Sequence, residues 1–524
     1  MYHSLRHFIS FLEERGQLRR IQEPVSANLE ITEITDRVTK AGGPALLFEN
    51  VIRVDGRRSE FPLLINAYGS WQRMAWALGV EDIETIAREI DELVKTQPPS
   101  TLLDKLRMLP KLAKFGSFMP KAVGQGDCQS VVMKEPDLSI LPYLKCWPGD
   151  GGPYITFPIV ITKDPESGIR NVGTYRMQVF YTSNQPQSGV EGEALRAWPA
   201  EGATRAPMTA MHWQIHKGGS KHFQRYRELK RKIPVAVCLG GDPAYGYAAT
   251  APLPDNVDEL ILAGFLRKKA VELVRCKTID MEVPADCDFV IEGFVDPMEP
   301  LVREGPFGDH TGYYSLADDY PSFHVTAITH RKDPIYPTTI VGPPIQEDGF
   351  LGKASERIFL PLIRLTFPEI RDLCVPIETC FHNLAIVSIK KQYPGHAKKI
   401  MHSLWGMGQL MFSKCIIVVD EEVNVQNLPE VAWRVSNNID ARRDILFSEG
   451  PVDALDHAAP QFAYGSKMGI DATKKWKEEG FAREWPEVLQ MSAEVKKRVD
   501  EMWEKLALTR PSATLSRWRE RGWG

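Results

Sequence analysis

The sequence predicts a multidomain α/β protein in which a β-rich middle region lies between two regions that alternate helices and strands. Three observations support this fold class. The chain has 524 residues, whereas single hydrophobic cores usually stop growing at about 250 to 300 residues. Helical and strand patterns alternate near both ends, as they do in α/β domains. Between them lies a series of short β-rich runs separated by turns, which is typical of a barrel-like or sandwich domain.

Residues 1–126 are predicted to form an N-terminal α/β domain. Ser4 can cap a first helix, in which apolar side chains recur at helical spacing. A second helical stretch leads through a Gly-Gly-Pro break into a strand at residues 45–48, and further helical patterns cover residues 71–93. Residues 97–126 are rich in Pro, Gly and Lys, which indicates that the domain ends there.

Residues 127–335 form the predicted β-rich domain, because runs such as PVAVCLG, FVIEGFV and FHVTAITH follow one another with turns between them. Residues 336–524 form the predicted C-terminal α/β domain, in which helical patterns alternate with the strands NLAIVSIK and KCIIVVD. Within it, residues 494–508 are predicted to form a charged amphipathic helix, an element that more often makes docking or oligomer contacts than catalytic ones.

The composition favours a small-molecule partner and argues against several other classes. A net charge of −4 and a pI near 6.4 lack the basic character of nucleic-acid-binding domains. The sequence has no signal-peptide pattern and no run of about 18 apolar residues, so a cytoplasmic location is expected. The eight cysteines include no C-x-x-C pair, which argues for reduced thiols instead of a zinc site or a disulfide framework. Motifs typical of dinucleotide-binding proteins, P-loop nucleotidases, zincins and serine hydrolases are also absent.

An acidic loop at residues 304–314, EGPFGDHTGYY, is the densest candidate site. Two glycines and a proline between Glu304 and Asp309 disfavour a regular helix, so the two carboxyl groups can converge on a tight loop. Paired carboxylates repel each other and burial raises at least one pKa, so one of the two groups is expected to hold a proton near neutral pH. The alternative is a solvated polar turn.

Arg176 is a candidate for binding a substrate carboxylate. Asn171 and Arg176 are polar positions of different parity in one alternating strand, which predicts a bulge or a strand end. Arginine can bind a carboxylate bidentately, as the loss of carbon dioxide from an acid requires, and the alternative is a surface ion pair. Asn171, His212 and Glu259 offer an amide oxygen, an imidazole and a carboxylate, a set suited to Mn²⁺ or Mg²⁺ that bridges a phosphate. Each of these three residues taken alone is more often structural.

In that order along the chain, the segments NVGTYR, HWQIHKG, PDNVDE and EGPFGDHTGYY are similar to the signature blocks of the UbiD decarboxylases. The segments LEITEITDR, AGGPALLFEN, KCWP, KKQYPGHAKK and GSKMGIDATKKW resemble the quinone-pathway members, so the likeness covers nearly the whole chain. The resemblance implies a central split β-barrel that binds flavin and a C-terminal α/β domain that contributes to oligomer contacts. It also implies prenylated FMN made by a separate flavin prenyltransferase, with its phosphate held through a divalent metal, usually manganese, and in many members a potassium ion.

The resemblance also assigns individual binding residues. The implied metal ligands are Asn171, His212 and Glu259. The position of Lys217 and that of His212 vary within the family, and a quinone-pathway enzyme of the family carries arginine at both. The implied flavin contacts are Thr174, Tyr175, Arg176, His212, Trp213, Gln214, Lys217 and Gly218.

The implied acid–base set is Arg176, Glu304 and Asp309, with Asp309 as the expected proton donor. Expelling carbon dioxide directly from an aromatic ring would leave an aryl anion, so an electron sink or a prior protonation of the ring carbon is needed, and the cofactor supplies the sink. Arg176 would bind the substrate carboxylate and later tune Glu304, while Asp309 or Glu304 protonates the carbon that loses carbon dioxide.

The expected substrate is a 4-hydroxy-3-polyprenylbenzoate, which would become a 2-polyprenylphenol in ubiquinone biosynthesis. A menaquinone-pathway dihydroxynaphthoate, a simple hydroxybenzoate and an acrylic acid are alternatives within the family. A non-catalytic flavin or metal binding module is disfavoured because the acid–base set is complete, and a manganese hydrolase would need no flavin. Since a prenylated acid must leave the bilayer, weak peripheral contact with the inner face of the cell membrane is expected. A homo-oligomer between a dimer and a hexamer is expected as well.

Overall fold

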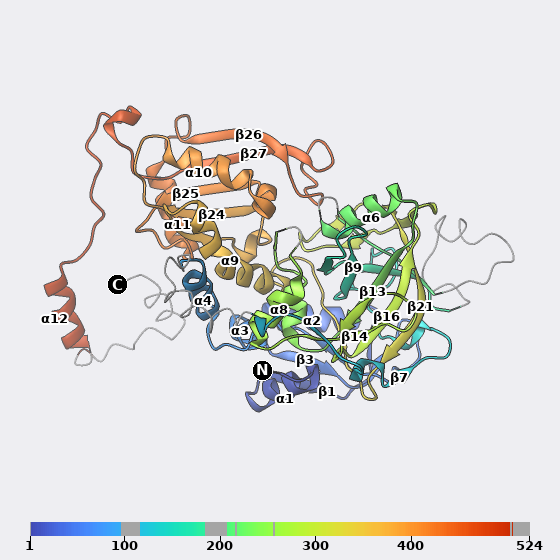
Figure 1. Ribbon diagram of the computed structural model, residues 1–524. Helices are drawn as coiled ribbons and strands as arrows, with labels where there is room; N and C mark the ends of the chain where they lie inside the picture. Colours follow the sequence, from blue (N-terminus) through green and yellow to red (C-terminus); the bar gives the residue numbers. More distant parts are fainter. Residues whose placement is uncertain are drawn as a thin grey trace, which may run out of the picture. The chain divides into compact units, whose positions relative to one another are not determined.

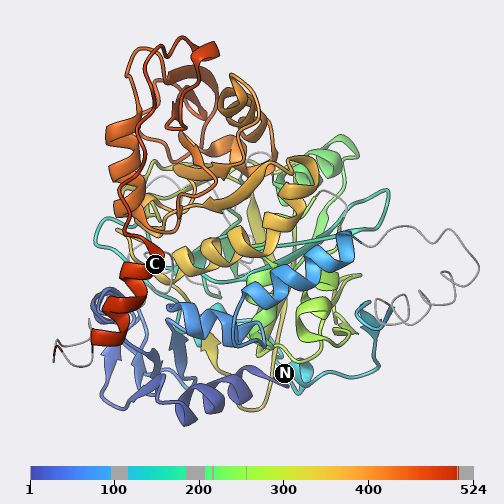
Figure 2. The same cartoon turned by 90° about the vertical axis from the view of Figure 1, so that its left-hand side faces the viewer.

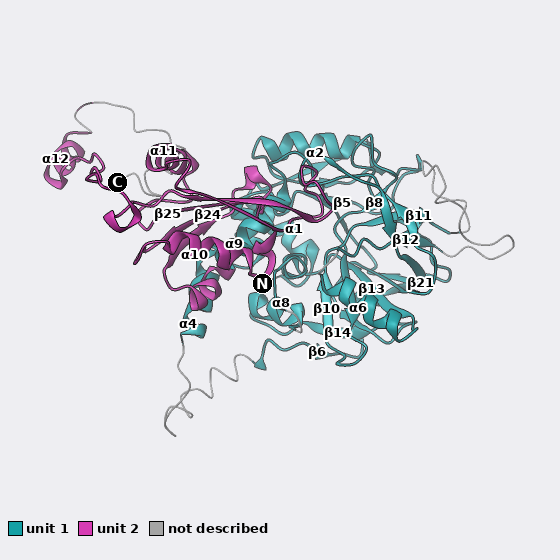
Figure 3. Ribbon diagram, turned by 90° about the horizontal axis from the view of Figure 1, so that it is seen from above, with its two compact units in different colours: residues 1–358 teal, residues 359–524 magenta. Residues whose placement is uncertain are grey.

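The structure is a computed structural model that describes residues 2–95, 116–183, 207–214, 217–254, 257–503 and 506. It divides into two compact units, Met1–Ile358 and Phe359–Gly524, which Figure 3 shows in different colours. Helix α9 (Glu347–Thr366) runs through the boundary. Much of the predicted linker at residues 97–126 lies outside the described residues, and the division into three domains stays a prediction.

The first part of unit 1 is a small mixed sheet with nearby helices; all of these elements except strand β22 are drawn in blue in Figure 2. Its strand order is β1-β3-β5-β22, with β3 and β5 antiparallel and the other two pairs parallel. The strands of this sheet are β1 (Leu18–Ile21), β3 (Ala45–Phe48), β5 (Leu63–Ile65) and β22 (Tyr336–Pro337), beside the short pair β2 (Val25–Ser26) and β4 (Val51–Ile52). The helices are α1 (Leu5–Glu14), α2 (Glu30–Lys40), α3 (Trp71–Ala77) and α4 (Glu84–Val94).

The N-terminal elements follow the sequence pattern closely. The Ser4 hydroxyl accepts a hydrogen bond from the backbone N–H of His7 and so caps α1, whose apolar residues are buried. Strand β3 coincides with the predicted strand at residues 45–48. The helical pattern over residues 71–93 is divided between α3 and α4, because the chain turns at Gly79, where φ is +75°.

The centre of unit 1 is a nine-stranded sheet within the described residues. Its order is β10-β9-β13-β16-β21-β12-β11-β8, and β7 pairs with β21. Figure 1 shows the long strands β9, β13, β16 and β21 curling side by side. The strands are β7 (Val131–Val132), β8 (Tyr154–Ile155), β9 (Ile159–Lys163), β10 (Arg170–Gly173), β11 (Met177–Tyr181), β12 (Met208–Ala210), β13 (Ile233–Leu239), β16 (Phe289–Val295) and β21 (Ser322–His330).

Both faces of this sheet are buried, which makes it a rigid support for a site. Alternate residues of β13 enter different cores: Val235 and Val237 lie in one apolar cluster, whereas Ala236 and Cys238 lie in another. In the strand order β10 stands at one end and β11 next to the other end. Strand β10 ends at Gly173 and β11 begins at Met177, so Arg176 lies directly before β11, in the segment that connects the two strands. The predicted irregularity around Arg176 is therefore a strand end.

Smaller elements of unit 1 flank this sheet. Two hairpins carry the acidic loop: β17 (Val302–Glu304) pairs with β20 (Asp318–Tyr320), and β18 (Phe307–Gly308) pairs with β19 (Tyr314–Ser315). The remaining elements are the sheet of β6 (Lys121–Ala122), β14 (Glu272–Arg275) and β15 (Glu282–Pro284), and the helices α6 (Gly218–Glu228), α7 (Pro243–Ala248) and α8 (Glu259–Arg267).

Unit 2 has one sheet with the order β23-β24-β25-β27-β26. Its predicted strands NLAIVSIK and KCIIVVD are β24 and β25, which pair in parallel as expected for an α/β domain. The elements are β23 (Ile370–Cys374), β24 (Leu384–Ile389), β25 (Cys415–Asp420), β26 (Ile445–Pro451), β27 (Tyr464–Asp471), α10 (His396–Trp405), α11 (Leu428–Asn438) and α12 (Ala493–Trp503). Helix α12 corresponds to the predicted terminal helix, of which residues 504, 505, 507 and 508 lie outside the described part.

Two predictions about the whole chain can be compared with these elements. None of the eight cysteines is part of a disulfide, as expected; six are buried, and Cys276 and Cys415 are half-buried. Within the described ranges, no helix has both the length and the apolar character that crossing a bilayer requires.

Candidate active site

Arg176 connects the two acidic residues of the predicted loop. Its Nε donates to Glu304 Oε1 at 2.9 Å, and one Nη donates to Glu304 Oε2 at 3.3 Å. Its other Nη donates to Asp309 Oδ2. The Arg176 side chain is 8% exposed and that of Glu304 is fully buried. The predicted convergence of the two carboxylates is therefore present, and it depends on an arginine that lies more than a hundred residues away in sequence.

Backbone geometry fixes the acidic loop against the central sheet. Gly305 has a φ of +93°, a conformation that favours glycine, and its N–H donates to Gln178 Oε1 at 2.8 Å. The N–H of Gly308 donates to Asp150 Oδ1 at 2.8 Å, and a Cβ at this position would lie 2.2 Å from the Trp147 ring. These contacts restrain the short segment between Glu304 and Asp309, and both residues contact Arg176.

The electrostatics differ from the sequence-based expectation, which placed a proton on one carboxyl group. Burial raises the pKa of Glu304, but the charge of Arg176 and the hydrogen bond from His212 outweigh it and lower the pKa to about 2. Burial likewise opposes ionisation of Asp309, yet Arg176 and His310 bring its pKa well below the usual range. The expected raised pKa is therefore wrong for this arrangement, because a bidentate arginine stabilises both charges.

His212 joins this acid–base cluster. Its Nδ1 lies 3.1 Å from Glu304 Oε2, and its Nε2 lies 3.5 Å from the Tyr320 hydroxyl. The two rings are 4.2 Å apart between centroids. Burial lowers the pKa of His212, and the charge of Arg176 lowers it further. A neutral imidazole that donates from Nδ1 to Glu304 is consistent with these contacts.

Predicted flavin contacts form a second cluster next to the first. The Tyr175 hydroxyl lies 3.4 Å from Asn171 Nδ2 and accepts from the N–H of Gly219 at 3.3 Å. A Cβ on Gly218 would lie 1.8 Å from Asn171 Oδ1, and one on Gly219 would lie 2.5 Å from the Trp213 ring. Arg176 and His212 thus belong to the first cluster, whereas their sequence neighbours Tyr175 and Trp213 belong to the second.

The second cluster fits a flavin phosphate and its polar neighbours. Among the described residues, Thr174 Oγ1 and Trp213 Nε1 are buried without a hydrogen-bond partner, a condition that native proteins usually avoid unless a ligand or water satisfies the atom. Helix α6 begins at Gly218, with Lys217 as its N-cap, and helix N-termini favour anions. The N–H of Lys217 donates to the Gln214 carbonyl at 3.2 Å, so Gln214 lies in the turn before this helix. Residues 215–216 of the motif lie outside the described part.

Two of the predicted metal ligands lie beside this cluster. Glu259, the first residue of α8, accepts a hydrogen bond from the N–H of Val172 at 2.7 Å, next to Asn171 in β10. Burial raises the pKa of Glu259 to about 7, and a nearby cation would favour its charged form. Amide and carboxylate oxygens are ligands that Mn²⁺ and Mg²⁺ accept. Among the described residues no group of three or more His, Cys, Asp or Glu is arranged for a metal ion, so a cation here would need the Asn171 amide and oxygens from a ligand. Ligation by His212 stays a prediction.

Four residues that were not predicted as site residues also contact the first cluster. Ser315 accepts from Arg176 through its Oγ at 3.1 Å, and the Phe307 ring lies 4.5 Å from the guanidinium carbon. His310 and Tyr320 contact Asp309 and His212, respectively. His310 and Ser315 lie in or beside the acidic motif, which was the only available signal; nothing in the sequence indicated Tyr320.

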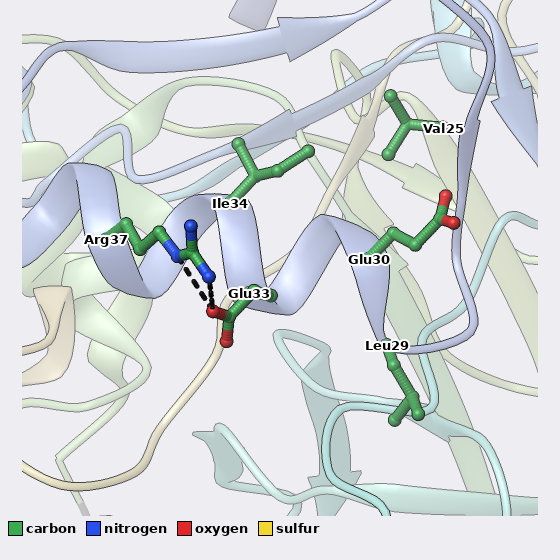
Figure 4. A pocket seen from close by; sticks show the side chains of 6 residues that line it. All are labelled: Val25, Leu29, Glu30, Glu33, Ile34 and Arg37. Carbon is green, nitrogen blue, oxygen red and sulfur yellow. Dashed lines mark hydrogen bonds and ion pairs between the residues drawn. The ribbon is translucent and has the colours of Figure 1, made fainter.

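A hollow of about 410 Å³ beside α2 has a different character. Figure 4 shows the Glu33 and Arg37 side chains paired with each other at its rim. Both are exposed, and an exposed i, i+4 ion pair is ordinary helix-surface chemistry. The hollow is lined by Val25, Leu29, Glu30, Glu33, Ile34 and Arg37.

Comparison with known proteins places this site in a family. Three family models match the chain: the N-terminal, Rift-related and C-terminal domains of 3-octaprenyl-4-hydroxybenzoate carboxy-lyase, at residues 9–93, 121–344 and 349–472. An uncharacterized protein of Aquifex aeolicus (strain VF5) is 51% identical over 510 residues, which is 97% of this chain and 99% of that protein.

Solved structures agree with this assignment. Vanillic acid decarboxylase from Sedimentibacter hydroxybenzoicus, in its closed form, is 26% identical with a TM-score of 0.79, and the match covers 97% of this chain and 99% of the other. The UbiD-class enzyme HmfF from Pelotomaculum thermopropionicum, in complex with FMN, is 28% identical with a TM-score of 0.73, over 93% and 97% of the two chains. An evolved dimeric form of HmfF contains prFMN.

The fold and the matches define the protein as a carboxy-lyase. More specifically, the chain belongs to the UbiD family, and it is a decarboxylase of the kind that includes enzymes of aromatic acids.

Proposed function

We propose that the protein decarboxylates a 4-hydroxy-3-polyprenylbenzoate to a 2-polyprenylphenol, with prenylated FMN as cofactor, as a step of ubiquinone biosynthesis. The observation that carries the catalytic part is the placement of Arg176 between the carboxylates of Glu304 and Asp309. An arginine held by two acids can exchange one of them for the substrate carboxylate. The released acid then loses its charge partner and can take up a proton.

The residues around the proposed flavin site support the cofactor. Thr174 Oγ1 and Trp213 Nε1 offer buried polar atoms, and the two glycines at the start of α6 let the Asn171 and Trp213 side chains approach the helix N-terminus closely. Arg176 lies next to Tyr175 in sequence and so at the border of the two clusters. When bound, the prenylated flavin would supply the electron sink that loss of carbon dioxide from a ring requires.

The roles of the acid–base residues follow from their contacts. Arg176 would orient the substrate carboxylate, and buried Glu304 would stay fixed by His212. Asp309, released from Arg176, would protonate the carbon that has lost carbon dioxide. Asn171 and Glu259 would hold Mn²⁺ at the flavin phosphate, with His212 as a third proposed ligand and K⁺ as a further proposed ion. The flavin would come from a separate flavin prenyltransferase.

Apolar side chains beside the acidic loop support a substrate with a hydrocarbon tail. Tyr313, Tyr314 and Leu316 follow Asp309 closely in sequence and are 60%, 48% and 86% exposed. Exposed apolar residues grouped near a site commonly mark a binding surface for an apolar ligand. A substrate of this kind would also require weak contact with a membrane surface, and we propose a homo-oligomer as the working form.

The test uses protein produced together with a flavin prenyltransferase and loaded with Mn²⁺. Carbon dioxide release is measured for 4-hydroxybenzoate, for 4-hydroxy-3-polyprenylbenzoates of increasing tail length, for vanillic acid, for a dihydroxynaphthoate and for an acrylic acid. We expect kcat/KM to rise with tail length. Equal turnover of tailed and untailed acids would contradict the proposed substrate, and no turnover of any acid by fully loaded protein would contradict the catalytic assignment.

A further inference from the structure

Each turnover of a decarboxylase consumes one proton, because the carboxylate leaves as neutral carbon dioxide and the product carbon gains a hydrogen. The donor must therefore be reprotonated from solvent in every cycle. If Asp309 is the donor, it starts from an unfavourable position, since its side chain is only 9% exposed. A route from solvent to this carboxyl group is needed.

His310 is placed to provide the last step of that route. Asp309 Oδ1 lies 2.9 Å from His310 Nδ1 and also accepts from the His310 backbone N–H at 2.8 Å. Asp309 Oδ2 is the oxygen that accepts from Arg176. The imidazole therefore contacts the oxygen that Arg176 does not use. The His310 ring is half-buried, with 15% of its side chain exposed.

Asp348, in the first turn of α9, interacts electrostatically with His310 and Asp309. The loop that carries His310 packs against the segment leading into this helix: a Cβ on Gly312 would lie 3.1 Å from Pro343 Cα. Burial raises the pKa of Asp348 to about 7, the charge of His310 lowers it, and the charges of Glu347 and Asp309 raise it. A buried carboxyl group with a raised pKa can hold a proton near neutral pH.

We propose that His310 and Asp348 form a proton relay that supplies Asp309 with the proton used in each turnover. The inference rests on the proposed decarboxylation and adds two residues to it. When the substrate carboxylate replaces Asp309 on Arg176, the His310 imidazolium transfers its Nδ1 proton to Asp309 Oδ1 and becomes neutral. Asp309 then gives this proton to the product carbon and returns to the carboxylate form. Asp348 transfers its carboxyl proton to His310 Nε2, and the Asp348 carboxylate takes a proton from water.

The proton reaches Oδ1, whereas the substrate is expected on the side of Oδ2, where Arg176 binds. Rotation of the carboxyl group about its last torsion connects the two positions, and for aspartate this torsion has broad, roughly two-fold wells. Replacement of His310 by glutamine preserves an N–H donor near Asp309 but removes the group that both accepts and gives a proton. The variant His310→Gln therefore distinguishes a proton-transfer role of His310 from a role in positioning Asp309.

The kinetic test compares His310→Gln and Asp348→Asn with two matched controls, His402→Gln and Asp280→Asn, whose side chains are exposed. We expect each relay variant to lower kcat by about 10- to 100-fold, less than or equal to the usual effect of losing a general acid. We expect KM and flavin occupancy to stay unchanged, the solvent deuterium isotope effect on kcat to increase, and added imidazole to restore part of the rate in His310→Gln. A kcat within about twofold of wild type, or a loss with neither imidazole rescue nor a larger isotope effect, would overturn the relay.

A spectroscopic test needs neither flavin nor substrate. In protein labelled with ¹⁵N-histidine, the ring signals of His310 are assigned by their disappearance in His310→Gln. Asp348→Asn should shift these signals, whereas Asp280→Asn should leave them in place. Unchanged His310 signals in Asp348→Asn would overturn the proposed coupling even if the wild-type enzyme is active. Failure of the loaded wild-type protein to decarboxylate any acid would instead contradict the proposed function, while the spectra would still decide whether His310 and Asp348 interact.

Discussion

The conservative variants Glu304→Gln and Asp309→Asn should lose most turnover while they retain the fold and the flavin. Each change preserves shape but removes a group that can carry a proton. Loss of a general acid or base typically lowers a rate by about two to four orders of magnitude, which corresponds to about 3 to 5 kcal/mol of activation free energy. A residue of a solvated turn would change the rate very little.

The structure indicates why stability should change much less than the rate. In Asp309→Asn, the amide oxygen can still accept a hydrogen bond from the backbone N–H of His310. In the native protein this N–H lies 2.8 Å from Asp309 Oδ1. Arg176 would keep its two hydrogen bonds to Glu304 and so would not become an unpaired buried charge. In Glu304→Gln, Asp309 remains as the charged partner of Arg176. Breaking a buried pair completely would cost about 3 to 5 kcal/mol, and neither variant does so.

The assay measures single-turnover carbon dioxide release with a polyprenylbenzoate, the flavin absorbance of the purified variants and their unfolding temperatures. Asp280→Asn, at a side chain that is 82% exposed, is the matched control for an acid-to-amide change. If both active-site variants decarboxylate at nearly the wild-type rate with bound prenylated flavin, the acidic loop is not the acid–base centre. A large fall in unfolding temperature together with flavin loss would show instead that the residues are structural.

Further expectations concern the cofactor, the metal, pH and the membrane. Protein produced without a flavin prenyltransferase should release no carbon dioxide, and activity with plain FMN would contradict this. Exhaustive chelation should lower flavin occupancy, because a phosphate near Glu259 needs a cation to offset repulsion; full occupancy by absorbance would argue against a metal. Burial opposes ionisation of Glu369, but Lys399 and His396 lower its pKa to about 2, so its stabilising effect is present above its usual pKa of 4.5 and disappears as pH falls towards 2. Glu369→Gln should therefore lower the unfolding temperature of unit 2 at pH 7 by about 2 to 4 °C, and the difference should shrink at pH 3. Part of the protein should sediment with anionic vesicles, and complete recovery in the supernatant would contradict the proposed membrane contact.

Much of the fold could be predicted because local patterns agree with the elements that formed. The capped helix after Ser4, the strand at β3 and the parallel pair β24 and β25 all follow from periodicity and break residues. The split of residues 71–93 into two helices was missed, since a single glycine is a weak signal for a turn.

The proximity of the candidate acid–base residues was predictable, but their charges were not. Arg176, Glu304 and Asp309 were chosen as a group, and they contact one another. Their protonation depends on one guanidinium that donates hydrogen bonds to both carboxylates. This arrangement results from tertiary packing and has no pattern in sequence. The contacts of Tyr320 with His212 and of Asp150 with Gly308 were missed for the same reason, because each joins segments more than a hundred residues apart.

Arg176 provides one positive charge for two carboxylates, and this ratio affects how an acid substrate can enter. A third carboxylate would give the cluster an excess of negative charge in a buried place, where unpaired charge is costly. We therefore expect substrate binding to draw a proton into the site, so that one of the displaced carboxylates becomes neutral. On this view the hydrogen found in the product is taken up when the substrate arrives, before any carbon–carbon bond breaks, and the affinity for the acid should weaken as the solution becomes more alkaline.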